Sequence, residues 1–378
     1  MKHILLLWII FFSLVAKGQV QNADYNEITA TLQDYINGTS YSDPALIKRA
    51  FTEEAQLLLN HKDKEIWQVS PSEYSSWFDN TGKFTGRVGE ILSIDVNGNI
   101  ATAKVEILVP EKSQRYVDMF LLKKLSKGWR IISKTATSES VQHSGKRILF
   151  IVSNAHFHGD SNLPTGVSFS EIVKAYDTFK KAGYTVDFVS PEGGAIPLAY
   201  INTSEQIHKD YLYNTDFMFA IKHTKQPSQI EAANYLAVHY VGGGNAMYGV
   251  AENVEIQNIA MTIYEEHNGI VSSVCHGTAG IVNLKTKDGE YLVAGKRISG
   301  YPDSYENQSR QYFKEFPFLI QKTIEERGGE FLFSARNTAH VEVDGRIVSG
   351  QNHLSSAAVA EKMIEILKRD SGNREILR

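Results

Sequence analysis

The sequence predicts an α/β fold for its C-terminal part, a doubly wound and mostly parallel sheet, preceded by a small α+β domain. Two observations predict the parallel sheet. Apolar runs alternate with helical patterns from Lys146 onward, and the runs are continuous, as in RILFIVS at 147–153. Continuous apolar runs are typical of strands that are buried on both faces. A third observation sets the first 140 residues apart, because there helical patterns come first and alternating strands follow.

The N-terminal part, residues 19–140, is expected to form helices that pack on a curved antiparallel sheet. The helical patterns lie at 25–38, 43–51 and 70–78. The first of them repeats apolar side chains at helical spacing, namely Ile28, Leu32 and Ile36. The alternating strands lie at 89–109 and 115–137. The Asn97-Gly98 pair in the first strand segment is a strong hairpin signal.

The C-terminal part, residues 146–370, shows the order expected of repeated strand–helix–strand units. Strands are expected at 147–153, 185–190, 235–244 and 269–274, and helices at 169–184 and 254–269. Ligands of such sheets bind beyond the carboxyl ends of the strands. Three segments fall at those ends: Asn154–Gly166, Gly242–Asn245 and Cys275–Gly277. We therefore expect these segments to converge on one site.

The first residues predict a secretory signal peptide at 1–18. Lys2 and His3 form a short basic start, and an apolar run of about a dozen residues follows, which is too short to span a bilayer comfortably. Ala16 and Gly18 then supply the small side chains of a cleavage site before Gln19. We expect an exported protein, periplasmic or secreted, that has no membrane anchor after cleavage. An uncleaved N-terminal anchor is the alternative.

The composition excludes some classes of partner. The formal net charge is −4 and the isoelectric point is near 6.3, so nothing indicates binding to nucleic acid or to an anionic membrane. The 378 residues include one cysteine, Cys275. A single thiol in an exported chain is an intermolecular partner, a reactive group or a buried apolar residue.

The local sequence VSSVCHGTAG favours a reactive role for Cys275. The expected strand ends at Val274, and a helix is expected to begin one or two residues later. A residue on such a tight turn projects over the sheet edge in a strained conformation, as in the nucleophile elbow of hydrolases. We expect the helix N-terminus to lower the thiol pKa toward the thiolate. His276 is suited to carry protons if a third group orients its ring.

Two long stretches carry a family resemblance. VCHGTAGIVNLKTKDGEYLVAGKRISGY and PTGVSFSEIVKAYDTFKKAGYTVDFVSPEGG closely resemble the ThiJ/PfpI superfamily, whose members are class I glutamine amidotransferase-like proteins. The resemblance is best to the heat-shock-protein-31-like branch, which includes glutathione-independent glyoxalase III. It extends from Lys146 to about Arg369, includes VDGRIVSGQN, and implies a flavodoxin-like fold.

The N-terminal part resembles a different family. Its helix order and its final strand pair, which ends in GWRIISK, resemble the SnoaL-like or nuclear-transport-factor-like cone fold, in particular its lumazine-binding type. The resemblance implies an enzyme, a ligand pocket or a dimerisation module. Because the sequence shows no paired His and Asp with an enzymatic layout in this part, we predict a binding or assembly role. Both families commonly dimerise, so a homodimer is expected.

The ThiJ/PfpI resemblance implies a catalytic set of Cys275, His276 and Glu171. The glutamate is that of the TGV-x-x-x-E pattern beginning at Thr165. A carboxyl group near a thiolate in a dry pocket has a raised pKa and can carry a proton at neutral pH. The alternative for Glu171 is an exposed residue in the first turn of a helix.

The resemblance also implies a reaction. Cys275 would attack the aldehyde of a 2-oxoaldehyde such as methylglyoxal, and Glu171 and His276 would shuttle protons through an enediol. Hydrolysis of the resulting thioester would release a 2-hydroxy acid such as lactate. Neither a metal nor an organic cofactor is implied.

The third strand is followed by a departure from the family pattern. Relatives read GGHGAMWD, whereas this chain has Gly244 at the histidine, Asn245 at the next glycine and Gly249 at the aspartate. Backbone N–H groups at Gly243, Gly244 and Asn245, with that of His276, are expected to hold a developing oxyanion. This departure bears on the substrate class more than on the nucleophile.

Two further predictions concern polar side chains near the expected site. Asp303, in GYPD, is a candidate to orient His276, and a solvated loop carboxylate is the alternative. His156 and His158 follow the first strand, but their spacing alone is a weak metal signal and no metal site is predicted.

Three functional hypotheses remain open on the sequence. The first is an exported cysteine-dependent enzyme that acts on a small carbonyl compound, with glyoxalase III-like chemistry. The second keeps the same nucleophile but has an amide substrate, which gives a cysteine amidase or peptidase of the PfpI type. The third is a non-catalytic stress holdase in which Cys275 senses oxidation.

Overall fold

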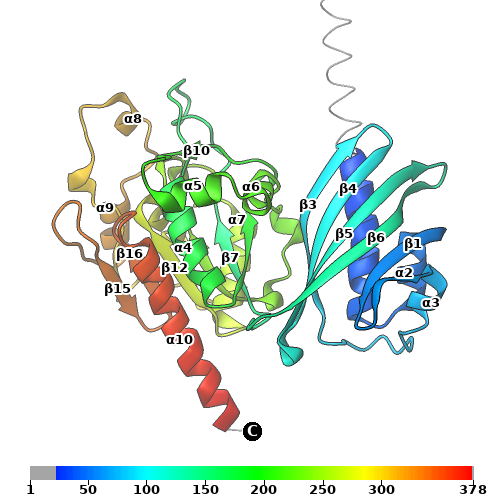
Figure 1. Ribbon diagram of the computed structural model, residues 1–378. Coiled ribbons are helices and arrows are strands. Elements are labelled where there is room, and N and C mark those ends of the chain that lie inside the picture. Colours follow the sequence, from blue (N-terminus) through cyan, green and yellow to red (C-terminus); the bar gives the residue numbers. More distant parts are fainter. Residues whose placement is uncertain (1–22, 377–378) are drawn as a thin grey trace, which may run out of the picture. The chain divides into compact units, whose positions relative to one another are not determined.

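A computed structural model describes residues 23–376 of the chain (Figure 1). The predicted signal peptide lies outside the described residues. The chain divides into two compact units between Gly145 and Lys146. None of the helices described is long and apolar enough to cross a membrane.

The first unit contains three helical segments, which are residues 23–40, α2 (Pro44–Ala50) and α3 (Pro71–Ser75). Two strands lie between α2 and α3, so the expectation that the helices precede all of the strands is wrong. The apolar face predicted for the first helix is in the core, since Ile28, Leu32 and Ile36 are at most 4% exposed. The side chains of Asp43 and Ser70 accept backbone N–H groups at the starts of α2 and α3. These caps explain why the two short helices begin where they do.

These helices accompany a six-stranded sheet, whose strand order is β2-β1-β6-β5-β4-β3. The strands are β1 (Phe51–His61), β2 (Lys64–Val69), β3 (Val88–Asn97), β4 (Ile100–Val109), β5 (Gln114–Leu125) and β6 (Gly128–Ser140). The predicted hairpin turn is present, with Gly98 at φ 61°. The antiparallel prediction is wrong at one pair, because β1 runs parallel to β6. β1 starts directly after α2 and has no turn signal before it, so periodicity did not separate the two elements.

The second unit is built on a six-stranded sheet in the order β15-β16-β12-β11-β7-β9. The strands are β7 (Arg147–Ile151), β9 (Thr185–Val189), β11 (Tyr235–Tyr240), β12 (Ile270–Val274), β15 (Val341–Asp344) and β16 (Ile347–Gly350). All neighbouring strands pair in parallel except β15, which is an antiparallel edge strand. The doubly wound, mostly parallel sheet is therefore confirmed.

Helices cover both faces of this sheet (Figure 1). Alternate residues of β7 belong to opposite apolar cores, because successive side chains of a strand point to opposite faces. Ile148 and Phe150 lie in the core with α4 (Phe169–Lys181) and α10 (Ser356–Ile376). Leu149 and Ile151 lie in the core with α7 (Val254–Glu265) and α9 (Ile320–Glu326).

Shorter helices and strands lie in the segments that connect the main strands and helices of this unit. They are β8 (Val167–Ser168), β10 (Leu198–Ala199), α5 (Gln206–Leu212), α6 (Thr215–Lys222), β13 (Arg297–Ile298), α8 (Gln311–Lys314) and β14 (Glu330–Phe331). β8 pairs in parallel with β10, and this small sheet leads directly into α4. Several of these connections contribute to the candidate site described next.

Candidate active site

The segments that follow β7, β11 and β12 converge, as predicted, on a cavity of about 530 Å³. His158 comes from the first segment, Gly243 and Gly244 from the second, and Cys275 and His276 from the third. The carboxyl ends of neighbouring parallel strands meet at one edge of a sheet, so residues far apart in sequence share one site.

Cys275 lies at a strained turn directly after β12. Its backbone is in the left-handed region, with φ 56°, and the residue is 7% exposed. Residues other than glycine rarely adopt this conformation, and they cluster in it at functional sites. The turn also depends on Gly277, because a Cβ there would lie 2.3 Å from the carbonyl oxygen of Tyr240. The predicted strained turn is therefore present.

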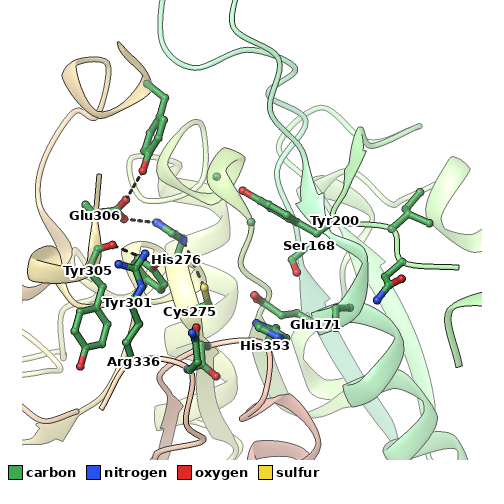
Figure 2. A pocket seen from close by; sticks show the side chains of 18 of the residues that line it. Ser168, Glu171, Tyr200, Cys275, His276, Tyr301, Tyr305, Glu306, Arg336 and His353 are labelled. Atoms are coloured by element: carbon green, nitrogen blue, oxygen red, sulfur yellow. Dashed lines mark hydrogen bonds and ion pairs between the residues drawn. The ribbon is translucent and has the colours of Figure 1, made fainter. Parts of the chain in front are cut away.

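His276 lies between the thiol and a carboxylate (Figure 2). Its Nδ1 is 3.4 Å from the Sγ of Cys275, and its Nε2 is 2.6 Å from the Oε1 of Glu306. An ionised carboxylate only accepts hydrogen bonds, so Nε2 carries a proton when it bonds to Glu306. In the neutral ring, Nδ1 is then free to accept a proton from the thiol. Tyr301 stacks on the imidazole at 4.6 Å between ring centroids and limits its rotation.

The predicted orienting role of Asp303 is wrong, because Glu306 occupies that position. Asp303 accepts the backbone N–H groups of Gln321 and Lys322 at 3.1 and 3.0 Å, at the start of α9. A short 3-10 turn at Asp303–Tyr305 separates the two carboxylates and directs them to different partners. Glu306 lies three residues beyond the GYPD stretch that the sequence indicated, so the prediction found the neighbourhood of the orienting carboxylate but named the wrong residue.

Glu171 is buried beside the thiol, in the first turn of α4. It is 2% exposed, so the alternative of a solvated helix residue is wrong. Its Oε2 accepts the N–H of Gly242 at 3.0 Å, and its carboxyl group hydrogen-bonds with Cys275. Burial raises the pKa of Glu171 to about 7, although the hydrogen bond with Cys275 opposes the shift.

The expected lowering of the Cys275 pKa is not found. Burial, followed by the negative charge of Glu171, raises the pKa of the thiol, and the N–H of His276 opposes this only in part. The segment after Cys275 is a 3-10 turn of seven residues, so its N-terminus offers a weak dipole. Two acidic groups this close do not both ionise readily, and they act as one coupled pair.

Gly243 and Gly244, which follow β11, lie so close to other residues that neither position has room for a side chain. A Cβ on Gly243, which has φ 116°, would lie 2.4 Å from the oxygen of Gly166. A Cβ on Gly244 would lie 2.7 Å from Thr165 Oγ1 and 2.8 Å from the His158 ring. Both glycines line the cavity with bare backbone. The ring of His158 therefore lies next to Gly244, which is the position at which the family pattern has a histidine.

The side chain of Asn245 is directed away from the cavity, and the role predicted for the backbone N–H of this residue stays a prediction. The residue is fully buried and lies outside the cavity lining, and its Nδ2 donates to the carbonyl of Ser153 at 3.0 Å. Asn245 therefore ties this segment to the end of β7. The residue type at position 245 could not predict this hydrogen bond, because the acceptor is a backbone carbonyl in another loop.

The cavity extends well past the nucleophile. Its lining also includes Tyr200, Ile201, Asn202, His208, Tyr301, Tyr305, Arg336 and His353. Neither periodicity nor a motif indicated Tyr200, His208 or Arg336, which come from the loop after β10, from α5 and from the loop after β14. For His353, the family resemblance did imply a place in the pocket wall. His156 instead lines a second cavity of about 350 Å³. Across residues 23–376, no three His, Cys, Asp or Glu side chains are grouped as metal ligands would be.

Comparison with known proteins places this unit in a family. Residues 163–366 match the model described as the DJ-1/PfpI family. The chain belongs to the DJ-1/PfpI family. In the first unit, residues 23–136 match the model described as "Putative lumazine-binding". Both resemblances inferred from the sequence are thereby confirmed.

Individual relatives of this DJ-1/PfpI chain carry related names. A glutathione-independent glyoxalase of Schizosaccharomyces pombe is 28% identical over 59% of this chain and 98% of its own length. Glyoxalase 3 of Candida albicans is 29% identical over 56% of this chain and 93% of its own. The crystal structure of glyoxalase III from the latter organism superposes with a TM-score of 0.54 at 26% identity, covering 58% of this chain and 97% of that one.

Proposed function

We propose that this protein converts 2-oxoaldehydes to 2-hydroxy acids without glutathione, with Cys275 as the nucleophile. One observation carries the proposal: the sulfur lies between two proton acceptors, Glu171 and the Nδ1 of His276. The names of the relatives support the same reaction class. When a thiol lies between two bases, one base can deprotonate the thiol for attack and the other can transfer protons to and from the substrate.

The first step forms a bond between sulfur and the aldehyde carbon. The thiol proton passes to His276 or Glu171, and the carbonyl π electrons move to oxygen, which then takes up that proton to give a hemithioacetal. The N–H of His276, which bonds to the sulfur, and the backbone of Gly243 and Gly244, which lines the cavity, are the groups that would stabilise the charge on this oxygen.

The second step moves a proton between two carbons. A base removes the hydrogen of the former aldehyde carbon, giving an enediol, and a proton is delivered to the neighbouring carbon. The product is a thioester of the 2-hydroxy acid. Glu171 suits this transfer because its pKa of about 7 allows it to accept and release a proton near neutrality. Water then hydrolyses the thioester, releases the acid and restores the thiol.

One observation favours the amidase or peptidase hypothesis. The Cys275–His276–Glu306 arrangement matches the nucleophile, base and orienting carboxylate of cysteine hydrolases. Glu171 favours the oxoaldehyde reaction instead, because amide hydrolysis has no need for a second base beside the sulfur. The redox-sensor hypothesis is weaker, since sensor thiols are exposed and have a low pKa, whereas Cys275 is buried and its pKa is raised.

Export of the protein is a further part of this proposal. It is supported by the basic start, the short apolar run and the small residues before Gln19. Expression in a bacterial host followed by N-terminal mass analysis tests it. Protein recovered outside the cytoplasm and beginning at Gln19 is the expected result, whereas cytoplasmic protein beginning at Met1 would contradict it.

The central experiment incubates the chain from Gln19 with methylglyoxal in the absence of glutathione and measures lactate. Cys275→Ala and Glu171→Gln are expected to abolish lactate formation. Glu255→Gln is a matched control, because Glu255 is also in the first turn of a helix but is exposed. Absence of lactate from the folded wild-type protein, or lactate formation that survives Cys275→Ala, would refute the proposed function.

A further inference from the structure

The cavity is larger than a three-carbon substrate requires. Its volume is about 530 Å³, and it continues from Cys275 past Tyr301 and Tyr305 to Arg336. Pockets of several hundred cubic ångströms bury ligands much bigger than methylglyoxal. The part of the cavity beyond the thiol is therefore available to a substituent of the substrate.

Arg336 is held beside the cavity by two tyrosines (Figure 2). Its guanidinium carbon lies 5.7 Å from the centre of the Tyr305 ring, a cation–π distance. Its side chain also hydrogen-bonds with the Tyr301 hydroxyl. These contacts position the guanidinium group but leave its charge without a counterion.

The carboxylates that line the cavity have other partners. Glu306 bonds to His276 at 2.6 Å, and Glu205 lies 3.2 Å from the Nζ of Lys174. The pKa of Glu171 is raised to about 7, so much of its population is neutral near that pH. Among residues 23–369, whose side chains the structure describes, no Asp or Glu side chain forms an ion pair with Arg336. The guanidinium group of Arg336 therefore has no carboxylate partner of its own among the residues that the structure describes.

Tyr301 connects this charge to the reacting centre. Its ring stacks on the His276 imidazole, its N–H donates to the carbonyl of Cys275 at 3.2 Å, and its hydroxyl reaches Arg336. An anion at the guanidinium group is thus separated from His276 by one tyrosine ring. A flexible chain of a few carbons can span that separation while its aldehyde carbon lies at the sulfur.

We propose that Arg336 binds an anionic group of the substrate, so the preferred substrates are 2-oxoaldehydes with a carboxylate or phosphate several bonds from the aldehyde. The inference rests on the proposed function and specifies its substrate class. The planar guanidinium forms two parallel hydrogen bonds with either anion. For 4,5-dioxopentanoate, addition of one water yields 2-hydroxypentanedioate by the same proton transfers, and no oxidant or reductant is consumed.

The first experiment compares 4,5-dioxopentanoate with the uncharged 2-oxopentanal, which has the same number of carbons. Wild type is expected to favour the carboxylated substrate in kcat/KM. Arg336→Gln is expected to reduce this preference roughly 10-fold, chiefly by raising KM for the carboxylated substrate. Lys314→Gln is the matched control, since Lys314 is an exposed cation on α8 outside the cavity lining. Equal losses on both substrates in Arg336→Gln would overturn the proposal.

A second measurement does not depend on turnover. Cys275 is the only cysteine, so its alkylation by iodoacetamide is unambiguous. Glutarate and propyl phosphate are each expected to slow alkylation in wild type but not in Arg336→Gln, and their relative strengths distinguish carboxylate from phosphate. Protection that is identical in both proteins would overturn the anion site. Protection without any 2-hydroxy acid product would instead refute the proposed reaction and retain the anion site.

Discussion

The Oε1 of Glu306 lies 2.6 Å from the Nε2 of His276, and this contact fixes which ring nitrogen faces the thiol. Without the carboxylate, the neutral imidazole could place its proton on either nitrogen. With the carboxylate, Nδ1 faces the sulfur as an acceptor. Glu306 therefore acts through His276 and is a positioning residue.

Glu306→Gln is expected to lower kcat for 2-hydroxy acid formation by a factor on the order of 10² to 10⁴. The amide can accept as well as donate, so it no longer enforces the required tautomer. KM should change little, because the reacting atoms do not touch Glu306 directly. A pH profile should also shift, which a purely structural role would not cause.

Asp303→Asn is the matched control for this variant. Asp303 is three residues away and accepts the first N–H groups of α9 instead of contacting His276. Thermal unfolding should show a loss of up to about 1 kcal/mol, the usual scale of a lost helix cap, with kcat unchanged. If Asp303→Asn lost activity as Glu306→Gln does, the assignment of the orienting residue would be wrong.

The rate of the proposed reaction is expected to rise with pH through about 7. Glu171 must be ionised to accept a proton, and burial raises its pKa to about 7. Measurement of kcat/KM against pH in wild type should show this acidic limb. Glu171→Asp keeps a titrating carboxyl group, so its kcat/KM should be much lower but should still rise with pH. A wild-type profile that is flat around pH 7 would contradict the assignment.

The same shift predicts how stability depends on pH. The folded pKa of Glu171 lies above its ordinary value of 4.5, so its contribution is fully present below that value and is lost as pH rises through about 7. Glu171→Gln removes this titration. Denaturant unfolding should therefore show that the variant gains stability relative to wild type as pH is raised from below 4.5 to above 7. A stability difference that does not vary with pH would argue against the raised pKa.

The sequence predicted the scaffold of the site better than its electrostatics. Continuous apolar runs identify β7, β11 and β12, and their carboxyl ends specify where Cys275 and Gly243 must meet. Those features follow from local periodicity and from the general rules of parallel sheets. The thiol pKa depends instead on burial and on the distance to Glu171, which lies 104 residues earlier and is brought close only by tertiary packing.

Loop residues were the least predictable part. Glu306 and Asp303 are both acidic and only three residues apart, and the turn between them decides which one faces His276. Arg336 lies beyond β14 in a connection that carries no recognisable pattern. Its relevance emerges only from the cavity that it lines and from its contacts with two tyrosines.

The conformation of Cys275 leads to a stability prediction. An L-residue in the left-handed region costs roughly 1 kcal/mol, whereas glycine adopts that region freely. Both Cys275→Ala and Cys275→Gly remove the sulfur, but only the second relieves the strain at φ 56°. The glycine variant is expected to be more stable than the alanine variant by up to about 1 kcal/mol in urea unfolding. If the alanine variant were the more stable, Cys275 would not be strained.

Gly244 and His158 are expected to be energetically coupled. A Cβ at Gly244 would lie 2.8 Å from the Cε1 of His158 and 2.7 Å from the Oγ1 of Thr165, closer than unstrained carbon contacts allow. Gly244→Ala should therefore destabilise the protein by about 1–3 kcal/mol, as overpacking generally does. His158→Ala removes one of the two obstacles, so the double variant should lose less than the sum of the single changes. A double-mutant cycle in unfolding free energy measures this coupling. Strict additivity would mean that Thr165 alone, and not His158, excludes a side chain at 244.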